Sequence, residues 1–406
     1  MSKLCVNLPP FAPDYSGVAS TLFELGGMIV IHDASGCTGN YLGYDEPRWL
    51  GSKSLVFCSG LRHMDAILGN DDLLIQRIVN AVNDTHPKFV ALLGSPVPMV
   101  IGTDYEGIAT ELESRTGIPC FGFDTKGLAY YTKGVSMAIV ALLKKFYPKK
   151  AAAGGTVAAG ESHAINLLGA TPLDFGNTDN VKRFVSLFQT NGIKVLNSFG
   201  MENSLENIRL AADAALNLVV SGSGYEAAVY MKKTYGIPFV CETPVGDGGI
   251  SLRRVQDFFD GDSDSEKECG TGEMPDLNGT KGERIFIAGD QVISNSIRNY
   301  MEALSRDTGK SVSVRVGNLF DAIPALQRKN DLVIKDELEL RTFLNSDECD
   351  RIVADPLVEQ LLTAKTKEQG VQFFGLPHTA VSSKICWDKT KLFLSEEFTS
   401  FITEVL

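Results

Sequence analysis

The chain has 406 residues, of which 44% are hydrophobic and 22% are charged, and its formal net charge is −12. This length is enough for two or three domains with sizeable cores, and the acidic balance argues against a nucleic-acid partner, because such a partner selects a basic face. We find no apolar run of about 18 residues and no apolar signal-peptide core behind Met1, so we expect no membrane span and a cytoplasmic protein.

Short apolar segments alternate with amphipathic segments along the whole chain. The clearest pairs of strand and helix are residues 89–93 with 105–114, 194–196 with 205–215, and 216–220 with 226–235. Short continuous apolar strands separated by amphipathic helices are typical of parallel sheets that are covered on both faces. We therefore predict an α/β protein with three Rossmann-like, doubly wound domains and mainly parallel sheets.

Two stretches of different composition divide this alternation into three blocks. Residues 151–156 are rich in Ala and Gly, and residues 260–282 are acidic, rich in Gly, Ser and Asp, and almost free of apolar periodicity. We predict domains at 1–155, 156–259 and 283–406, with 260–282 as an acidic, Gly-rich linker. Cys269 lies inside this linker, which is a poor place for a rigid metal site.

The segment 28–37 carries the strongest chemical signal. A β-branched apolar run ends there in a polar turn that presents Cys37, and a second apolar segment, 54–58, ends in Cys58. Ligands of open α/β sheets gather where strands end, so both thiols are candidates for chemistry. The alternative for each is a small buried hydrophobe, which is how most free cysteines behave. The eight cysteines form no C-x-x-C pair, so any metal ligands must converge by folding.

Residues 221–227 follow an apolar segment and open a helix with the pattern G-x-G-x-x-A, and Glu242 follows Gly222 by 20 residues. This spacing has the form of a dinucleotide-binding fingerprint, although the pattern normally marks the first strand of a domain. A tight turn with close helix packing is the alternative. No G-x-x-x-x-G-K-[ST] motif is present, so ATP hydrolysis through a P-loop would need a partner.

Two of the five histidines, His32 and His378, follow apolar segments in loops where each would face a cleft between domains. A hydrogen-bonded loop histidine is the alternative for each.

Three motifs in the first 125 residues resemble the catalytic components of nitrogenases and nitrogenase-like reductases. Residues 31–37 resemble the family's strand followed by His-Gly-Pro-x-Gly-Cys, and residues 59–69 resemble its Ser-x-Leu-x-Glu-x-Asp segment. Residues 95–98 and 101–104 resemble Thr-Cys-Val-Pro and Ile-Gly-Asp-Asp. Weaker similarity continues to the C-terminus, as at 216–219, 289–290 and 373–378.

The resemblance implies three Rossmann-like domains, an iron–sulfur cluster between paired subunits, and a substrate pocket among the domains. It assigns catalytic roles to His32 and His378, the latter as axial ligand or proton donor. The cofactor-contacting positions that it implies around the pocket are Ser59, Ser221, Gly246 and Gly289, with an additional metallocofactor or a tetrapyrrole as the group they would contact.

Differences from the family's cysteine pattern limit which kind of family member this chain can be. Only Cys37 matches a family cysteine cleanly, Pro96 replaces another, and Cys5 is the thiol nearest to a third position. Ser221 stands where nitrogenase carries the cysteine that fixes its large cofactor. A standard dinitrogen-reducing enzyme is therefore not expected.

A symmetric dimer would restore four thiolates, because each residue then occurs twice. Cys37 and Cys58 from two chains give the Cys₄ set of a [4Fe–4S] cluster, and Cys37 with Cys5 is the competing set. A heterodimer with a related chain is the alternative to this symmetric dimer. We expect an oxidoreductase component that receives electrons from an ATP-hydrolysing P-loop iron–sulfur reductase. The alternatives are a metallocofactor maturation scaffold without turnover and a nicotinamide-dependent enzyme.

Overall fold

A computed structural model describes residues 6–52, 54–147, 163–176, 178–261 and 282–406. It contains three separate sheets, and every strand pair within them is parallel. Helices cover the sheets, as expected for doubly wound folds. The α/β prediction and its three parallel sheets are confirmed. The predicted boundary at 151–156 and most of the predicted linker lie outside the described residues.

The first sheet has the order β2-β1-β3-β4. Its strands are β1 (Met28–Ile31), β2 (Leu55–Cys58), β3 (Val90–Leu93) and β4 (Cys120–Phe123). All residues of β1 and β3 are buried, which explains their unbroken apolar sequence. The accompanying helical segments are α1 (Asp14–Leu22), α2 (Gly36–Asn40), η1 (Tyr41–Asp45), η2 (Pro47–Trp49), α3 (His63–Leu68), α4 (Asp71–Thr85), α5 (Pro96–Ile101), α6 (Tyr105–Thr116) and α7 (Tyr131–Phe146).

The second sheet has the order β6-β5-β7-β8. Its strands are β5 (Ala164–Ala170), β6 (Lys194–Gly200), β7 (Leu216–Val219) and β8 (Phe239–Cys241). The helical segments are α8 (Pro172–Phe175), α9 (Asp179–Thr190), α10 (Leu205–Ile208), η3 (Ala211–Asp213), η4 (Gly222–Gly224), α11 (Tyr225–Tyr235) and α12 (Gly249–Phe259). The helix predicted at 205–215 is wrong in length, because the chain forms only the short α10 and one 3₁₀ turn there.

The third sheet has the order β11-β10-β9-β12-β13. Its strands are β9 (Glu283–Gly289), β10 (Val312–Asn318), β11 (Leu332–Val333), β12 (Arg351–Ala354) and β13 (Gln372–Gly375). The helical segments are α13 (Gln291–Thr308), η6 (Pro324–Leu326), α14 (Glu337–Leu344), η7 (Pro356–Leu361), α15 (Ala364–Glu368), α16 (Thr379–Ser382), η8 (Ser383–Lys389) and α17 (Glu396–Val405).

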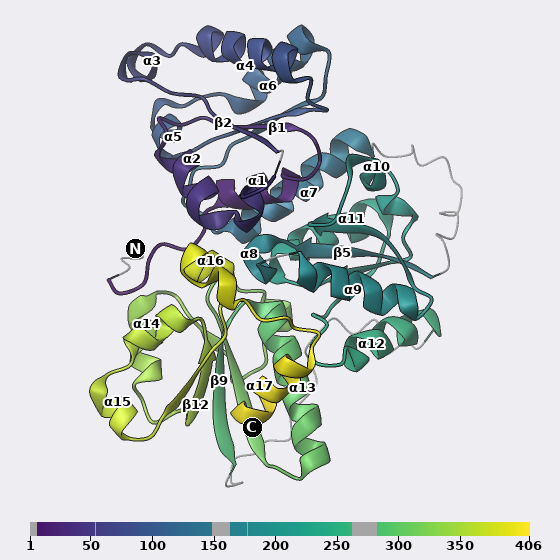
Figure 1. The fold of residues 1–406 in the computed structure, drawn as a ribbon, viewed down its shortest axis with the longest axis vertical. Coiled ribbons are helices and arrows are strands. Elements are labelled where there is room, and N and C mark those ends of the chain that lie inside the picture. Colours follow the sequence, from purple (N-terminus) through teal and green to yellow (C-terminus); the bar gives the residue numbers. More distant parts are fainter. Residues whose placement is uncertain (1–5, 53, 148–162, 177, 262–281) are drawn as a thin grey trace.

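The three sheets lie around a common centre, with α16 close to α8 and to the purple N-terminal part (Figure 1). Helices α1 and α7 pack closely because both carry glycine at the crossing. A Cβ added to Gly17 would lie 2.1 Å from the Tyr131 carbonyl oxygen, and one added to Gly134 would lie 1.8 Å from that of Asp14. A side chain at either position would force the two helices apart.

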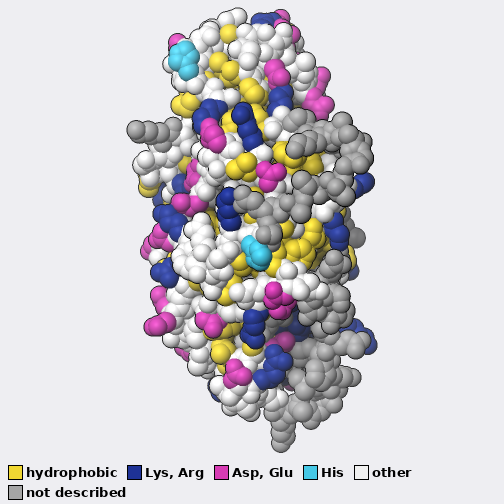
Figure 2. Space-filling view, turned by 90° about the vertical axis from the view of Figure 1, so that its right-hand side faces the viewer, with side chains coloured by type: hydrophobic (Ala, Val, Ile, Leu, Met, Phe, Trp, Pro, Cys, Tyr) yellow, Lys and Arg dark blue, Asp and Glu magenta, His cyan; other side chains and the backbone are white. Residues whose placement is uncertain are grey.

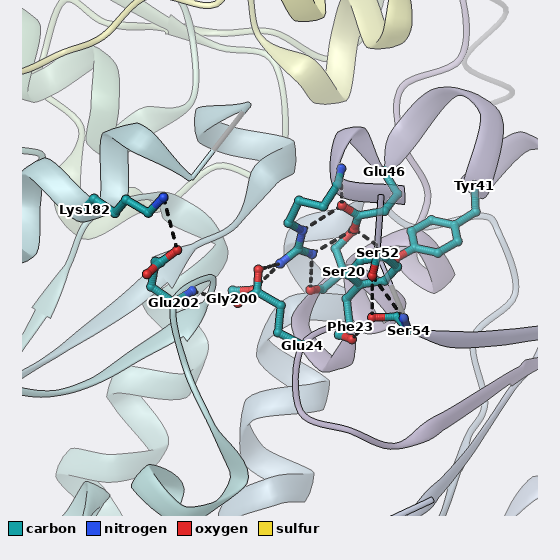
Figure 3. A network of polar contacts seen from close by, with 11 residues as sticks. Ser20, Phe23, Glu24, Tyr41, Glu46, Ser52, Ser54, Lys182, Gly200 and Glu202 are labelled. Atoms are coloured by element: carbon teal, nitrogen blue, oxygen red, sulfur yellow. Dashed lines mark hydrogen bonds and ion pairs between the residues drawn. The ribbon is translucent and has the colours of Figure 1, made fainter. Parts of the chain in front are cut away.

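A buried ion-pair network joins the first and second sheets. The Arg48 guanidinium bonds the Glu46 carboxylate at 2.7 Å, the Glu24 carboxylate at 2.9 Å and the Gly200 carbonyl at 3.0 Å. Glu24 also accepts the Glu202 backbone N–H at 2.8 Å, so both chain segments meet at this point (Figure 3). Since the Glu46 side chain is fully buried, removing its partner would leave an uncompensated charge.

Among the described residues, no helix is long and apolar enough to cross a membrane. On the face shown in Figure 2, the described Lys and Arg side chains are interspersed with Asp and Glu. This face has the mixed charge of an ordinary solvent-facing surface.

Candidate functional site

The carboxyl edge of the first sheet brings together two of the predicted site residues, His32 and Ser59. Ile31 pairs with Cys58 in the parallel register of β1 and β2, so the residues that follow both strands meet at one edge. The His32 Nδ1 lies 2.8 Å from the Ser59 hydroxyl oxygen. Burial lowers the pKa of His32 below its ordinary value of 6.5, so its imidazole is neutral at physiological pH.

Ser59 holds this edge through several bonds. Its hydroxyl oxygen accepts the Asp33 backbone N–H at 3.0 Å, and its carbonyl oxygen accepts the Arg77 guanidinium at 3.2 Å. His32, Ser59 and Arg77 line a small cavity that also borders Asp71. The pair is therefore fixed in position before any ligand binds.

Both candidate thiols of the described chain lie around Asp33. The Cys58 thiol donates to the Asp33 carbonyl oxygen at 3.2 Å. Cys37, in the first turn of α2, contacts the side chains of Asp33, Tyr15 and Ser95. Burial, and then the negative charge of Asp33, raises the pKa of the Cys37 thiol above its ordinary value. Both residues are half-buried, and Cys37 also packs against the hydrophobic core.

The Asp33 carboxylate shapes the turn that presents Cys37. It accepts the backbone N–H groups of Ser35 at 3.0 Å and of Thr38 at 3.1 Å. Ser35 has a φ of 146°, a conformation that non-glycine residues rarely adopt. Strained residues persist where the surroundings over-determine them, and they cluster at functional sites.

In the part of the chain that the structure describes, no three His, Cys, Asp or Glu side chains are arranged to hold a metal ion. Two of the three candidate metal ligands, Cys37 and Cys58, lie among the described residues. Cys5 and Cys269 lie outside the described residues. The remaining cysteines, Cys120, Cys241, Cys349 and Cys386, are buried. Burial raises the pKa of Cys120 and Cys349 to about 11, as expected for packing residues.

Large apolar side chains are exposed on two helices at this end of the first sheet. They come from α3 and α5, which follow β2 and β3 at the same edge and contact each other. The exposed fractions are Met64 59%, Ile67 63%, Leu68 71%, Val97 46%, Val100 80% and Ile101 40%. We call these six residues the apolar rim. A contiguous apolar surface of this kind on a water-exposed face marks an interaction site.

A second polar centre lies where the three sheets meet. Its hub is Asp174 in α8, whose carboxylate accepts hydroxyl hydrogen bonds from Tyr131 at 2.6 Å, Thr171 at 2.6 Å and Ser223 at 2.9 Å. Burial, reinforced by the negative charge of Asp290, raises the pKa of Asp174 to about 7. We call Tyr131, Thr171, Asp174, Ser221, Ser223, Asp290 and His378 the buried junction.

His378 enters the buried junction from the turn after β13. Its Nε2 lies 3.8 Å from the Asp174 Oδ1, and neither ring nitrogen has a hydrogen-bond partner among the described residues. Its ring packs against Phe320 at 5.0 Å and Tyr131 at 6.1 Å between centroids. Burial lowers the pKa of His378 to about 3, so the ring is neutral. An imidazole with two buried, unpartnered nitrogens is a place where a further polar group would fit.

Ser221 and Gly289 also belong to this region, whereas Gly246 does not. Ser221 donates its hydroxyl to the Gly169 carbonyl at 2.8 Å and contacts the Ser223 hydroxyl at 2.7 Å. Gly289 ends β9 directly before Asp290. Gly246 lies behind Tyr300, at a separate surface hollow.

The dinucleotide-like turn is occupied by the protein itself. The Gly222 N–H, which would face a pyrophosphate, bonds both carboxylate oxygens of Asp290 at 3.0 Å. The Ser223 carbonyl accepts the Ser136 hydroxyl at 2.8 Å. An anionic pyrophosphate would have to displace a carboxylate, so this turn has the geometry of packing rather than of nucleotide binding.

Asp33, Tyr131, Asp174 and Asp290 were not among the sequence-predicted site residues. Asp174 and Asp290 each follow a buried strand, and a carboxylate at the carboxyl end of a parallel strand was a usable signal. Tyr131 gives no local signal, because it starts a helix and reaches Asp174 only through the tertiary fold.

The comparisons with known proteins agree with this architecture. The sequence profile of the family described as nitrogenase component 1 type oxidoreductase matches residues 14–356. The chain is 25% identical over 280 residues to the nitrogenase iron-molybdenum cofactor biosynthesis protein NifE of Clostridium pasteurianum, covering 68% of this chain and 55% of that protein. It is 23% identical over 193 residues to one of the subunits of light-independent protochlorophyllide reductase of Zygnema circumcarinatum, covering 46% and 38%.

The curated relatives are longer than the matched part. The NifE protein of Methanosarcina barkeri is 24% identical, with 78% of this chain and 66% of that protein covered, so the chain spans about half to two thirds of these NifE proteins. A solved structure described as nitrogenase Cp1 at pH 5 superposes with a TM-score of 0.66 at 16% identity, over 99% of this chain and 88% of that chain. The profile match and the shared fold show that the chain belongs to the nitrogenase component 1 type oxidoreductase family.

Proposed function

We propose that this protein is a nitrogenase-like oxidoreductase component that works as a symmetric dimer and holds one [4Fe–4S] cluster between two copies of Cys37 and Cys58. The observation that carries the proposal is the pair of half-buried thiols around Asp33, at the end of the first sheet that also carries the exposed apolar rim. One chain supplies two half-buried sulfurs. A two-fold axis at this end of the sheet supplies four.

The residues fit such a group in three respects. Thiolate sulfur is the donor that iron–sulfur clusters require, and four are the usual number. The apolar rim would exclude water when covered by a second chain. The hydrogen bond between His32 and Ser59 and the Asp33 turn hold both cysteine loops in place. When bound, the cluster would supply one-electron transfer.

The proposal is tested by anaerobic reconstitution followed by iron and sulfide analysis and by size measurement. We expect about four iron atoms per dimer and a broad visible absorption. Cys37→Ala removes two of the four ligands of the dimer at once. This variant should therefore lose both the bound iron and the visible absorption. Cys120→Ala is the matched control, because that thiol is buried away from the sheet edge. Iron-free protein after reconstitution, or full iron in the Cys37 variant, would refute the proposal.

Cys58 and Cys5 are distinguished by the same assay. Cys58→Ala should reproduce the Cys37 defect, whereas a normal cluster in that variant with loss in Cys5→Ala transfers the assignment to Cys5. A cluster that forms only after a second, related polypeptide is added would show that the working unit is a heterodimer.

The electron donor in this proposal is an ATP-hydrolysing P-loop iron–sulfur reductase. The described chain offers the buried junction as the place of reduction, where neutral His378 and the Asp174 carboxyl lie 3.8 Å apart. These groups would position a bound substrate or metallocofactor and hold a proton beside it.

A maturation scaffold is the second candidate, and the similarity to NifE, a cofactor biosynthesis protein by name, favours it. Both candidates use the same cluster site. Turnover of a bound compound with a cognate reductase and ATP supports the reductase, whereas transfer of a bound metallocofactor to an acceptor protein without turnover supports the scaffold.

A further inference from the structure

The side chains around the Cys37 sulfur differ in charge and in hydrogen-bonding capacity. The sulfur contacts the side chains of Asp33, Tyr15 and Ser95. These three residues are almost fully buried, with exposed fractions of 2%, 5% and 0%. Water therefore screens their interactions with the sulfur only weakly, and each can change its electron-donating strength.

Asp33 brings a negative charge to this sulfur. It is the second residue of the segment 32–37, at the position where the similar family motif His-Gly-Pro-x-Gly-Cys carries glycine. Its Oδ2 accepts the backbone N–H groups of Ser35 and Thr38 and, at 3.4 Å, the Thr38 hydroxyl, so one carboxylate oxygen takes all three bonds. A negative charge beside a cysteine ligand disfavours the addition of an electron to the metal group that the ligand holds.

Tyr15 is the hydroxyl that can donate to the same sulfur. The Ser95 hydroxyl has a single proton and donates it to the His32 carbonyl at 2.8 Å, so Ser95 can only accept a bond from the thiol. The Tyr15 phenol is protonated at physiological pH, because burial raises its pKa above the ordinary value of 10. A cysteine sulfur bound to metal has lost its proton and acts as an acceptor. A hydrogen bond to such a sulfur withdraws electron density and favours the reduced state of a cluster.

The Cys58 sulfur has a donor of its own. The Gly60 backbone N–H donates to it at 3.4 Å. Because this donor belongs to the backbone, substitutions at positions 15 and 33 leave it in place. Their effects therefore report on Cys37.

We propose that Asp33 and Tyr15 are positioning residues that set the electron-donating strength of the Cys37 sulfur in opposite directions. The Asp33 charge strengthens it and lowers the reduction potential of the bound cluster. The Tyr15 hydroxyl weakens it and raises the potential. The effect on the potential rests on the proposed function, whereas the effect on the free thiol does not.

Redox titration of the reconstituted dimer, followed by its visible absorption, tests the effect on the potential. Asp33→Asn keeps an acceptor oxygen for the turn and removes the charge, so the midpoint potential should become more positive. Tyr15→Phe keeps the ring and removes the donor, so the potential should become more negative. Each substitution acts twice, since a symmetric dimer contains two copies of each residue.

Matched controls separate these effects from the general loss of a buried polar group. Asp355 is a buried carboxylate directly after β12 that accepts the backbone N–H groups of Leu357 and His378. Tyr300 is a buried phenol whose hydroxyl lies 3.1 Å from that of Thr399. Asp355→Asn and Tyr300→Phe should leave the potential unchanged. Unchanged potentials in Asp33→Asn and Tyr15→Phe, or shifts of both in the same direction, would overturn the proposal.

The free thiol gives a second measurement that needs no cluster. The rate at which iodoacetamide alkylates Cys37 in the iron-free full chain at pH 8, followed by peptide mass spectrometry, should rise about threefold in Asp33→Asn and fall in Tyr15→Phe. A pKa lower by about one unit gives about ten times more thiolate, but a less nucleophilic one. Buried Cys120 reports in the same digest whether the fold is intact. Failed reconstitution of the unmodified protein refutes the cluster and with it the effect on the potential, whereas unchanged alkylation in both variants overturns the action of Asp33 and Tyr15 on the sulfur.

Discussion

The pair formed by Asp174 and His378 should show opposite pH responses that cancel in the intact protein. Burial and the charge of Asp290 raise the pKa of Asp174 from 3.8 to about 7, and burial lowers that of His378 from 6.5 to about 3. Between pH 4.5 and 6.5 the folded pair thus holds one proton, on Asp174. The unfolded pair also holds about one, on His378, so its net effect on stability changes little with pH.

Each single variant exposes one half of this balance. In His378→Gln the contribution of Asp174 is no longer offset by His378, and for Asp174 the folded state binds the extra proton. Stability is then highest at low pH and falls as the pH rises toward 7. In Asp174→Asn the contribution of His378 is no longer offset by Asp174, and for His378 the unfolded state binds the extra proton. Stability is then highest above pH 6.5 and falls as the pH drops. One proton changes the free energy of unfolding by about 1.4 kcal/mol per pH unit, hence by about 2–3 kcal/mol across the window.

Urea unfolding, followed by circular dichroism at pH 4.5, 5.5 and 6.5, measures these slopes relative to the intact protein. The expected outcome is a negative slope for His378→Gln, a positive slope for Asp174→Asn and no slope for the double variant. Asp84→Asn, at an exposed carboxylate, is the control. If the free energy of unfolding depended on pH in the same way in all variants, the assignment of the proton to Asp174 would be refuted. The buried junction would then not hold a proton in this pH range.

Three further outcomes are expected. Arg48→Ala should lower the free energy of unfolding by about 3–5 kcal/mol, because a buried carboxylate loses its partner, while Lys367→Ala at an exposed ion pair should change it by less than about 1 kcal/mol. Gly134→Ala should destabilise by about 1–3 kcal/mol or more in thermal melting, and Gly43→Ala, which meets open space, should not. Cys269→Ser should keep both iron and melting temperature, since its acidic, Gly-rich sequence predicts few apolar contacts, and loss of either would contradict this.

The fold was accessible from sequence because burial leaves a local signature. Strands β1 and β3 are buried along their whole length, so their residues read as continuous apolar runs. The length of the helix predicted at 205–215 could not be read from the sequence. The same apolar pattern is compatible with short helical segments packed against the second sheet, and the chain forms α10 and a 3₁₀ turn there. Family membership followed from motif order and is confirmed by the profile match.

The sites were accessible only in part, for a physical reason. Cys58 ends β2 and Cys37 lies in α2, which follows β1, so the parallel pairing of β1 and β2 predicts both residues at the same sheet edge. The buried junction depends on three sheets converging, and Tyr131 reaches Asp174 across 43 residues of sequence. The hydrophobic periodicity of a local stretch of sequence gives no information about such a long-range contact. The roles of the predicted residues, and of Cys5, stay predictions.

The α1–α7 crossing connects the two centres. Tyr15 on α1 contacts Cys37, and Tyr131 on α7 bonds Asp174 at 2.6 Å, while Gly17 brings the two helix backbones into contact between them. Two helices packed backbone to backbone cannot slide without breaking this contact, so the separation between the thiol edge and the buried junction is fixed by the chain itself. A protein that passes electrons from one centre to the other needs such a fixed spacing.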